Sequence, residues 1–412
     1  AHHTALAAGD RLLAARAAAR LGVVLALRGE SAIAGGWLAR CERVLDDAGG
    51  DPPERGYLLV GRMLERVSLG DLEGARSIPE QIIACGRRHD DPNLLALGLN
   101  QQGRVLTVFG QVQPGLRLLD EAMVGVVADE VEPLVAGEVY CSMIEACQWV
   151  GDLGRAAQWT RALAQWCEAQ PVLVAFTGQC SLHRAQLMRL HGALRDAVLE
   201  LERSAERYAL AGGHPAVALA HSERGDVLRV LGDLDGAEHA YAQAVRHGAD
   251  AQPGRALLML AKGDVDRAAA SVRQTLAGVH GAIFRHRVIA GCVEVLLAAG
   301  SVEESAALAE EAAAIAVDFD CSAVRATSAT VTARVALARE DPTSALHEAR
   351  LALSGWSGLE AGYEVARARV LVARALRLLG DEEGAVIELV EAREAFVGQG
   401  AVRGAQTQGE GG

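Results

Sequence analysis

The sequence predicts an all-α protein, an α-solenoid or superhelix built from about ten helix-turn-helix repeats. Three observations carry this prediction. One turn phrase recurs along nearly the whole chain with a period of about 40 residues. Ala, Leu, Arg and Glu are abundant, and all four are strong helix formers. Alternating runs of β-branched or aromatic residues, which would indicate strands, are absent.

The recurring phrase is a turn glycine followed by a polar or small residue, with an alanine five positions after the glycine. Clear copies read GESAIA, GDLEGA, GDLGRA, GALRDA, GDLDGA, GDVDRA and GDEEGA, and weaker copies read GQVQPG, GSVEES and EDPTSA. The ten copies start at residues 29, 70, 110, 151, 192, 232, 263, 300, 340 and 380. Such a period is typical of stacked helical units, because no single unit can bury its own apolar face.

Each copy of the phrase predicts the junction between the two helices of a repeat. The glycine can adopt the left-handed conformation that ends a helix, and an acidic residue after it suits the positive end of the next helix. The alanine is small enough for the two helices to pack closely. Several repeats carry another small residue seven positions before the turn: Gly103, Ala185 and Gly225.

The repeats predict one solenoid domain over residues 10–400. Residues 1–9 are expected to form a flexible N-terminal segment. Residues 401–412, with the sequence AVRGAQTQGEGG, are expected to form a flexible Gly/Gln-rich tail. The chain starts without Met, which indicates a fragment or a processed product.

Charge and composition exclude several function classes. The net charge of −13 repels a phosphate backbone, and no basic run is present, so we expect no direct nucleic-acid binding by this fragment. No apolar stretch is long enough for a membrane helix. The eight cysteines lack paired spacing, and Cys141, Cys147, Cys167 and Cys292 lie in amphipathic runs. They are interpreted as small buried residues of a protein in the reducing cytoplasm.

The G-D-x-x-x-A turn, with a small residue seven positions before it, resembles the tetratricopeptide repeat. The copies here are longer than the usual ~34 residues, and many lack the large aromatic residue that opens that repeat. The whole set resembles the repeat region of LuxR-type large ATP-binding transcriptional regulators of high-GC bacteria. Segments that carry the resemblance include YCSMIEACQWVGDLGRAAQWTRALAQWCEAQP, ERGDVLRVLGDLDGAEHAYAQA and YEVARARVLVARALRLLGDEEGAVIEL.

The resemblance implies a sensor or scaffold module that lies between an ATPase module and a helix-turn-helix domain in a parent protein. The sequence contains no G-x-x-x-x-G-K-[ST] phosphate-binding motif. DNA binding and ATP hydrolysis are therefore implied only for flanking domains of such a parent.

Polar residues recur at fixed positions in the first helix of each mid-chain repeat. Six positions before the turn stand Arg104, Glu145, Gln186 and Asp226, and three positions before it stand Thr107, Gln148, Arg189 and Arg229. Residues three apart share one helix face, and first helices line the concave face of a tetratricopeptide superhelix. The candidate ligand- or partner-binding residues are Asn100, Arg104, Glu145, Gln148, Trp149, Gln179, His183, Arg184, Gln186, Arg189, Glu223, Asp226 and Arg229. The alternative is a solvated helix face that binds nothing.

Binding is favoured over catalysis. The motifs G-x-S-x-G, G-x-G-x-x-G and H-E-x-x-H do not occur. Cys85 with His89, and Cys180 with His183, lack the second pair that a zinc site needs, so no metal or other cofactor is expected. The expected partner is a small-molecule effector, a protein or a peptide in the concave groove, and a homo-oligomer is possible. The alternatives are a stand-alone tetratricopeptide adaptor and, less favoured, an enzyme that uses the polar groove.

Overall fold

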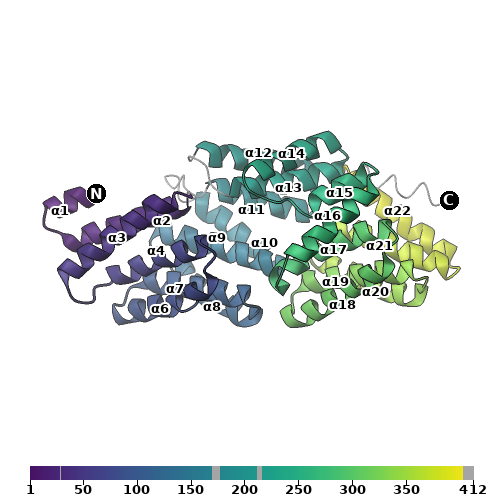
Figure 1. Ribbon diagram of the computed structural model, residues 1–412. Coiled ribbons are helices and arrows are strands. Elements are labelled where there is room, and N and C mark those ends of the chain that lie inside the picture. Colours follow the sequence, from purple (N-terminus) through teal and green to yellow (C-terminus); the bar gives the residue numbers. More distant parts are fainter. Residues whose placement is uncertain (28, 169–176, 211–215, 402–412) are drawn as a thin grey trace. The chain divides into compact units, whose positions relative to one another are not determined.

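The computed structural model describes residues 1–27, 29–168, 177–210 and 216–401. Within these residues the chain forms twenty-two helices and no strand. Figure 1 shows the helices in chain order. None of these helices combines the length and the apolar character needed to cross a bilayer. The prediction of an all-α helical-repeat protein is confirmed.

Apart from α1, the helices form ten hairpins, and in one of them α5 and α6 together replace the second helix. The helices are α1 His2–Ala7, α2 Arg11–Leu27, α3 Ser31–Ala48, α4 Glu54–Ser68, α5 Leu72–Ala75, α6 Ile78–Arg88, α7 Pro92–Val108, α8 Val112–Val127, α9 Pro133–Val150, α10 Leu153–Glu168, α11 Thr177–Leu190, α12 Leu194–Leu210, α13 Ala216–Leu231, α14 Leu234–Arg246, α15 Gly254–Ala261, α16 Val265–Gly278, α17 Ala282–Ala298, α18 Val302–Phe319, α19 Ser322–Ala338, α20 Pro342–Gly358, α21 Gly362–Leu378 and α22 Glu382–Gln399.

All ten predicted turns begin at a residue with a left-handed backbone. Nine of these residues are glycines with φ between +74° and +89°, and the tenth is Glu340 at +57°. The acidic residue after the glycine caps the next helix: the carboxylates of Asp71, Asp233 and Asp381 each accept a hydrogen bond from a backbone N–H three residues on. The phrase therefore encodes both the end of one helix and the start of the next.

The small residues of the repeat mark places where two helices nearly touch. A Cβ atom added at Gly103 would lie 2.8 Å from the carbonyl oxygen of Gly115 on the second helix of the same repeat. A Cβ atom added at Gly225 would lie 2.5 Å from the ring of Tyr241, which is almost fully buried. Larger residues at these positions would push the helices of a hairpin apart.

One feature differs from the sequence expectations, and the structure explains one irregularity of the repeat spacing. Residues 2–7, expected to be flexible, form α1, because His2 is buried and its Nδ1 hydrogen-bonds to the carbonyl oxygen of Ala14 at 2.8 Å. The short spacing between the turns at Gly232 and Gly263 arises because α15 has only eight residues. The predicted tail at 402–412 lies outside the described residues.

The helices form two compact units, one over residues 1–146 and 209–210 and one over residues 147–208 and 216–401. The first unit, unit 1, contains α1–α8 and most of α9. Its helices pack mainly on their neighbours along the chain, as in a simple stack of hairpins.

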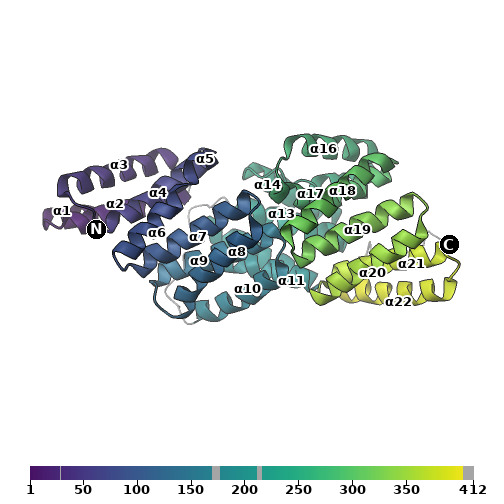
Figure 2. The ribbon, with the colours of Figure 1, turned by 90° about the horizontal axis from the view of Figure 1, so that it is seen from below.

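The second unit, unit 2, folds back on itself. Its early helices α11 and α12 share a core with its last helices α21 and α22, in which Leu182 and Leu201 lie with Ala366 and Phe396. The ends of these helices also meet, since the ring Nδ1 of His191 hydrogen-bonds to the carbonyl oxygen of Glu360 at 3.2 Å. Figure 2 shows α11 beside the ends of α20 and α22.

Candidate functional site

Hydrogen bonds and an ion pair join the end of α9 to the first helices α11 and α13 within unit 2. The amide of Gln148 at the end of α9 donates to Oε1 of Gln186 on α11 at 2.7 Å. The amide of Gln186 donates to Oε1 of Glu223 on α13 at 3.2 Å, and Nη1 of Arg189 lies 3.2 Å from Oε2 of Glu223. We call these four residues the polar ladder. Gln148, Gln186 and Arg189 belong to the predicted columns, three or six positions before their turns, whereas Glu223 lies nine positions before Gly232.

Asp226 and Arg229 continue along α13 from the ladder. Oδ1 of Asp226 accepts a hydrogen bond of 2.7 Å from the hydroxyl of Tyr241 on α14. Burial raises the pKa of Asp226 above its ordinary value, although the guanidinium groups of Arg229 and Arg189 act in the opposite direction. The carboxyl is therefore easier to protonate than an exposed aspartate.

The later first helices carry a second group of charges. Glu294 on α17 accepts hydrogen bonds from Arg334 on α19, at 2.7 Å, and from Arg367 on α21. Arg367 also lies 3.3 Å from Glu364, one turn earlier on α21. Burial alone would raise the pKa of Glu294, but Arg367 and Arg334 outweigh it and hold that pKa well below its usual range. The carboxylate is therefore charged whenever the protein is folded near neutral pH.

The two groups of charges face one another inside unit 2. The positive charge of Arg189 interacts with Glu364 as well as with Glu223, and Arg229 interacts with Glu294. The side chain of Arg189 is 43% exposed and that of Glu364 is 30% exposed, whereas Glu223 is buried, so this surface is partly solvated. We call it the inward polar face, and it comprises Gln148, Gln186, Arg189, Glu223, Asp226, Arg229, Arg287, Glu294, Arg334, Glu364 and Arg367.

Trp149 joins the start of unit 2 to α17. Its ring meets that of Phe284 edge-on, with 5.4 Å between the centroids, and the guanidinium carbon of Arg287 lies 4.6 Å above it. The imidazole Nε2 of His286 donates to the carbonyl oxygen of Trp149 at 2.6 Å. Trp149 therefore stabilises the closure of unit 2 and brings Arg287 towards Glu223 and Arg189.

Three other candidates are arranged differently. His183 is buried, with Nδ1 3.3 Å from Oε1 of Gln186, and Gln179 is half-buried. The structure does not bring Arg184 to the inward polar face. Its Nε donates instead to Oε1 of Glu200 on α12, at 3.1 Å.

Three of the predicted residues belong to unit 1. Arg104 on α7 donates to the hydroxyl of Ser142 at 3.0 Å and lies 3.5 Å from the carboxylate of Glu145, both on α9. Asn100 is fully buried, and its side-chain amide has no hydrogen-bond partner among the described residues. The predicted set is thus divided between the two units.

The sequence interpretation missed Arg287, Glu294, Arg334, Glu364 and Arg367. A signal for two of them was present: the column six positions before the turn continues with Glu294 and Arg334, and then with Arg374. The short repeat interrupts that column with Leu257, so the later positions look unrelated to the earlier ones. Within the described residues, no cluster of three His, Cys, Asp or Glu side chains has a geometry suited to a metal ion.

Comparison with known proteins gives structural neighbours only. No protein family matches the sequence, and no curated protein is similar to it. A Rap protein complexed with competence and sporulation factor is 12% identical, with a TM-score of 0.48 over 94% of this chain and 99% of that one. The Cut9–Hcn1 hetero-tetramer is 13% identical, with a TM-score of 0.45 over 96% and 85%. A tetratricopeptide repeat protein from Parabacteroides merdae is 15% identical, with a TM-score of 0.34 over 78% and 98%. These values carry no conclusion about ligand or activity.

Proposed function

We propose that this chain is a non-catalytic binding module that holds an effector against the inward polar face of unit 2. The observation that carries the proposal is the gathering of amides and charges of both signs, from α9, α11, α13, α17, α19 and α21, on one partly solvated surface. Charges that are fully removed from water destabilise a protein unless each of them is paired. Charges and amides that remain in contact with water can instead exchange their water for a ligand.

The chemistry of the face favours an effector with hydrogen-bond donors, acceptors and a carboxylate or phosphate. Gln148 and Gln186 can exchange hydrogen bonds with a peptide backbone, and Arg189 can bind an anionic group through two parallel hydrogen bonds. A purely anionic molecule would meet Glu223 and Glu294 unfavourably. A short peptide or a small zwitterionic molecule fits these requirements.

We further propose that the module is the sensor or scaffold region of a LuxR-type transcriptional regulator. An effector that touches both the early and the late helices of unit 2 would favour one degree of closure over another, and attached domains could respond to that change. The alternative is a stand-alone adaptor that holds a partner peptide. An ATPase motif or a DNA-binding helix-turn-helix in the same polypeptide would favour the regulator.

We expect Arg189→Ala to weaken effector binding by about 1–3 kcal/mol, which is roughly 5- to 150-fold in Kd. The probe is a peptide selected on the purified chain from a displayed random library, with native mass spectrometry as a search for a co-purified small molecule. Arg377→Ala is the matched control, because Arg377 occupies the same position of a late repeat, three residues before Gly380, and pairs with Glu382 outside the inward polar face.

Circular dichroism of both variants should match that of the unchanged chain. If both substitutions weaken binding of the probe equally, or if neither weakens it, the probe binds outside the inward polar face. Turnover of the probe would favour an enzyme instead.

A further inference from the structure

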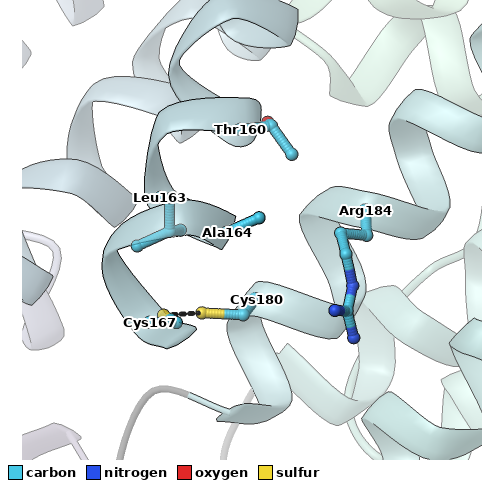
Figure 3. A pocket seen from close by; sticks show the side chains of 6 residues that line it. All are labelled: Thr160, Leu163, Ala164, Cys167, Cys180 and Arg184. Carbon is cyan, nitrogen blue, oxygen red and sulfur yellow. Dashed lines mark hydrogen bonds between the residues drawn. The ribbon is translucent and has the colours of Figure 1, made fainter. Parts of the chain in front are cut away.

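Two cysteines meet where α10 ends and α11 begins. Cys167 lies one residue before the end of α10, Cys180 lies in the first turn of α11, and their Sγ atoms are 3.1 Å apart. Both thiols line a cavity of about 160 Å³, together with Thr160, Leu163, Ala164 and Arg184. Figure 3 shows these six side chains. A disulfide bond is ~2.05 Å long, so the two sulfur atoms need to approach by only about 1 Å.

The surroundings of this pair differ from those of the other thiols. Cys167 is the one partly exposed cysteine among the eight, all of which lie in the described chain. Burial raises the pKa of Cys41 to about 11, and that of Cys292 and Cys321 to about 12. Because the thiolate is the reactive form, those buried thiols are protected at neutral pH.

Cys167 is activated by its neighbours. The hydrogen bond with Cys180 lowers the pKa of the Cys167 thiol, burial opposes this effect, and the charge of Arg184 lowers the pKa further. Arg184 pairs with Glu200, but Glu200 also pairs with Arg203 at 3.2 Å. Two guanidinium groups therefore share one carboxylate, and Arg184 is the one that lines the cavity beside the thiols.

We propose that Cys167 and Cys180 form an oxidation site, at which a hydroperoxide converts the two thiols into an intramolecular disulfide. The assignment rests on the contact between the sulfur atoms, the cavity beside them and the accessibility of Cys167. It is independent of the proposed effector.

The reaction has two steps. The thiolate of Cys167 attacks one oxygen of hydrogen peroxide, so that an S–O bond forms, the O–O bond breaks and the other oxygen leaves as water after protonation. The sulfur of Cys180 then attacks the sulfur of Cys167. The S–S bond forms, the S–O bond breaks, and the hydroxide leaves as a second water with the proton of Cys180. Two thiols are oxidised and one peroxide is reduced.

The test is oxidation of the reduced full chain with a small molar excess of hydrogen peroxide, followed by intact-mass measurement and non-reducing peptide mapping. We expect a mass lower by two hydrogen atoms and one cross-linked peptide that joins Cys167 to Cys180. Dithiothreitol should restore the original mass. A cross-link between other cysteines, or addition of oxygen atoms without a cross-link, would overturn the proposal, as would no reaction in the folded protein.

Three variants sharpen the result. Cys180→Ser keeps a hydroxyl beside Cys167 but cannot form the bond, so Cys167 should accumulate as a sulfenic acid that dimedone captures. Cys167→Ser should abolish both the cross-link and the dimedone adduct. Cys292→Ser, at a buried thiol, should leave cross-linking unchanged. Equal labelling of Cys167 and Cys292 by dimedone would also contradict the proposal.

Discussion

Replacing Phe396 with Ala is expected to lower the free energy of unfolding of unit 2 by about 3–5 kcal/mol, the range for deleting a buried Phe side chain. The ring is 2% exposed and lies in the core that α22 shares with α11 and α12. It also packs edge-on against Tyr363, at 5.7 Å between the ring centroids. The substitution therefore loosens the contacts by which unit 2 closes. Urea unfolding followed by far-UV circular dichroism measures the change.

Val397→Ala is the matched control for this prediction. Val397 is the next residue of the same helix, but its side chain is 65% exposed. Its replacement should change stability by less than ~0.5 kcal/mol. Because the two units can unfold in separate transitions, the free energies of the variants are compared for the transition that Phe396→Ala shifts, and not for the chain as a whole. Similar small effects of both substitutions would show that α22 does not pack on the early helices.

Glu294→Gln is expected to destabilise unit 2 by about 1–3 kcal/mol at pH 7. The change removes the negative charge that compensates Arg334 and Arg367. Loss of one partner from a fully buried ion pair would destabilise a protein by a larger amount, about 3–5 kcal/mol. The smaller value applies because a third of the Glu294 side chain is solvent-accessible. Chemical unfolding at pH 7 measures the difference from the unchanged chain.

The same substitution should change the dependence of stability on pH. The folded-state pKa of Glu294 lies below its unfolded value of about 4.3. Its stabilising contribution is therefore fully present above that value and is lost as the pH falls towards the folded-state pKa. The stability gap between the unchanged chain and Glu294→Gln should be largest near neutral pH and should narrow below about pH 4.

Glu303→Gln is the control for Glu294→Gln. Glu303 also pairs with an arginine, Arg339 at 2.8 Å, but 85% of its side chain is exposed. Exposed ion pairs contribute little, so the loss should be under ~0.5 kcal/mol. A loss from Glu294→Gln no larger than this, or one that acid does not reduce, would contradict the description of the Glu294 cluster.

The turns were predictable from the sequence because their causes are local. A left-handed residue must end a helix, and Gly232 followed by the capping carboxylate of Asp233 is recognisable without any distant contact. The turns between repeats were harder to find, since several use a left-handed residue with a side chain, such as Asp129, Asp320 or Glu360. No common sequence phrase marks them.

The closure of unit 2 could not be predicted because it depends on contacts across more than two hundred residues. Leu182 and Phe396 are ordinary apolar residues of amphipathic helices, and nothing in their local sequence indicates that they share a core. The polar columns located one half of the inward polar face, near Gln186 and Arg189. The other half, around Glu294 and Arg367, faces them only because the chain turns back.

Hydrogen exchange at the amides of α22, residues 382–399, tests the central claim most directly, because an open solenoid and a closed unit differ most at the last helix. In an open stack the terminal helix contacts one neighbour only and frays. In the closed unit it packs on α11 and α12 as well as on α21. The account predicts that the buried face of α22 exchanges within about tenfold of α13, residues 216–231, in the centre of the unit. Exchange of α22 faster than α13 by several orders of magnitude would contradict the closure, and with it the two-sided polar face.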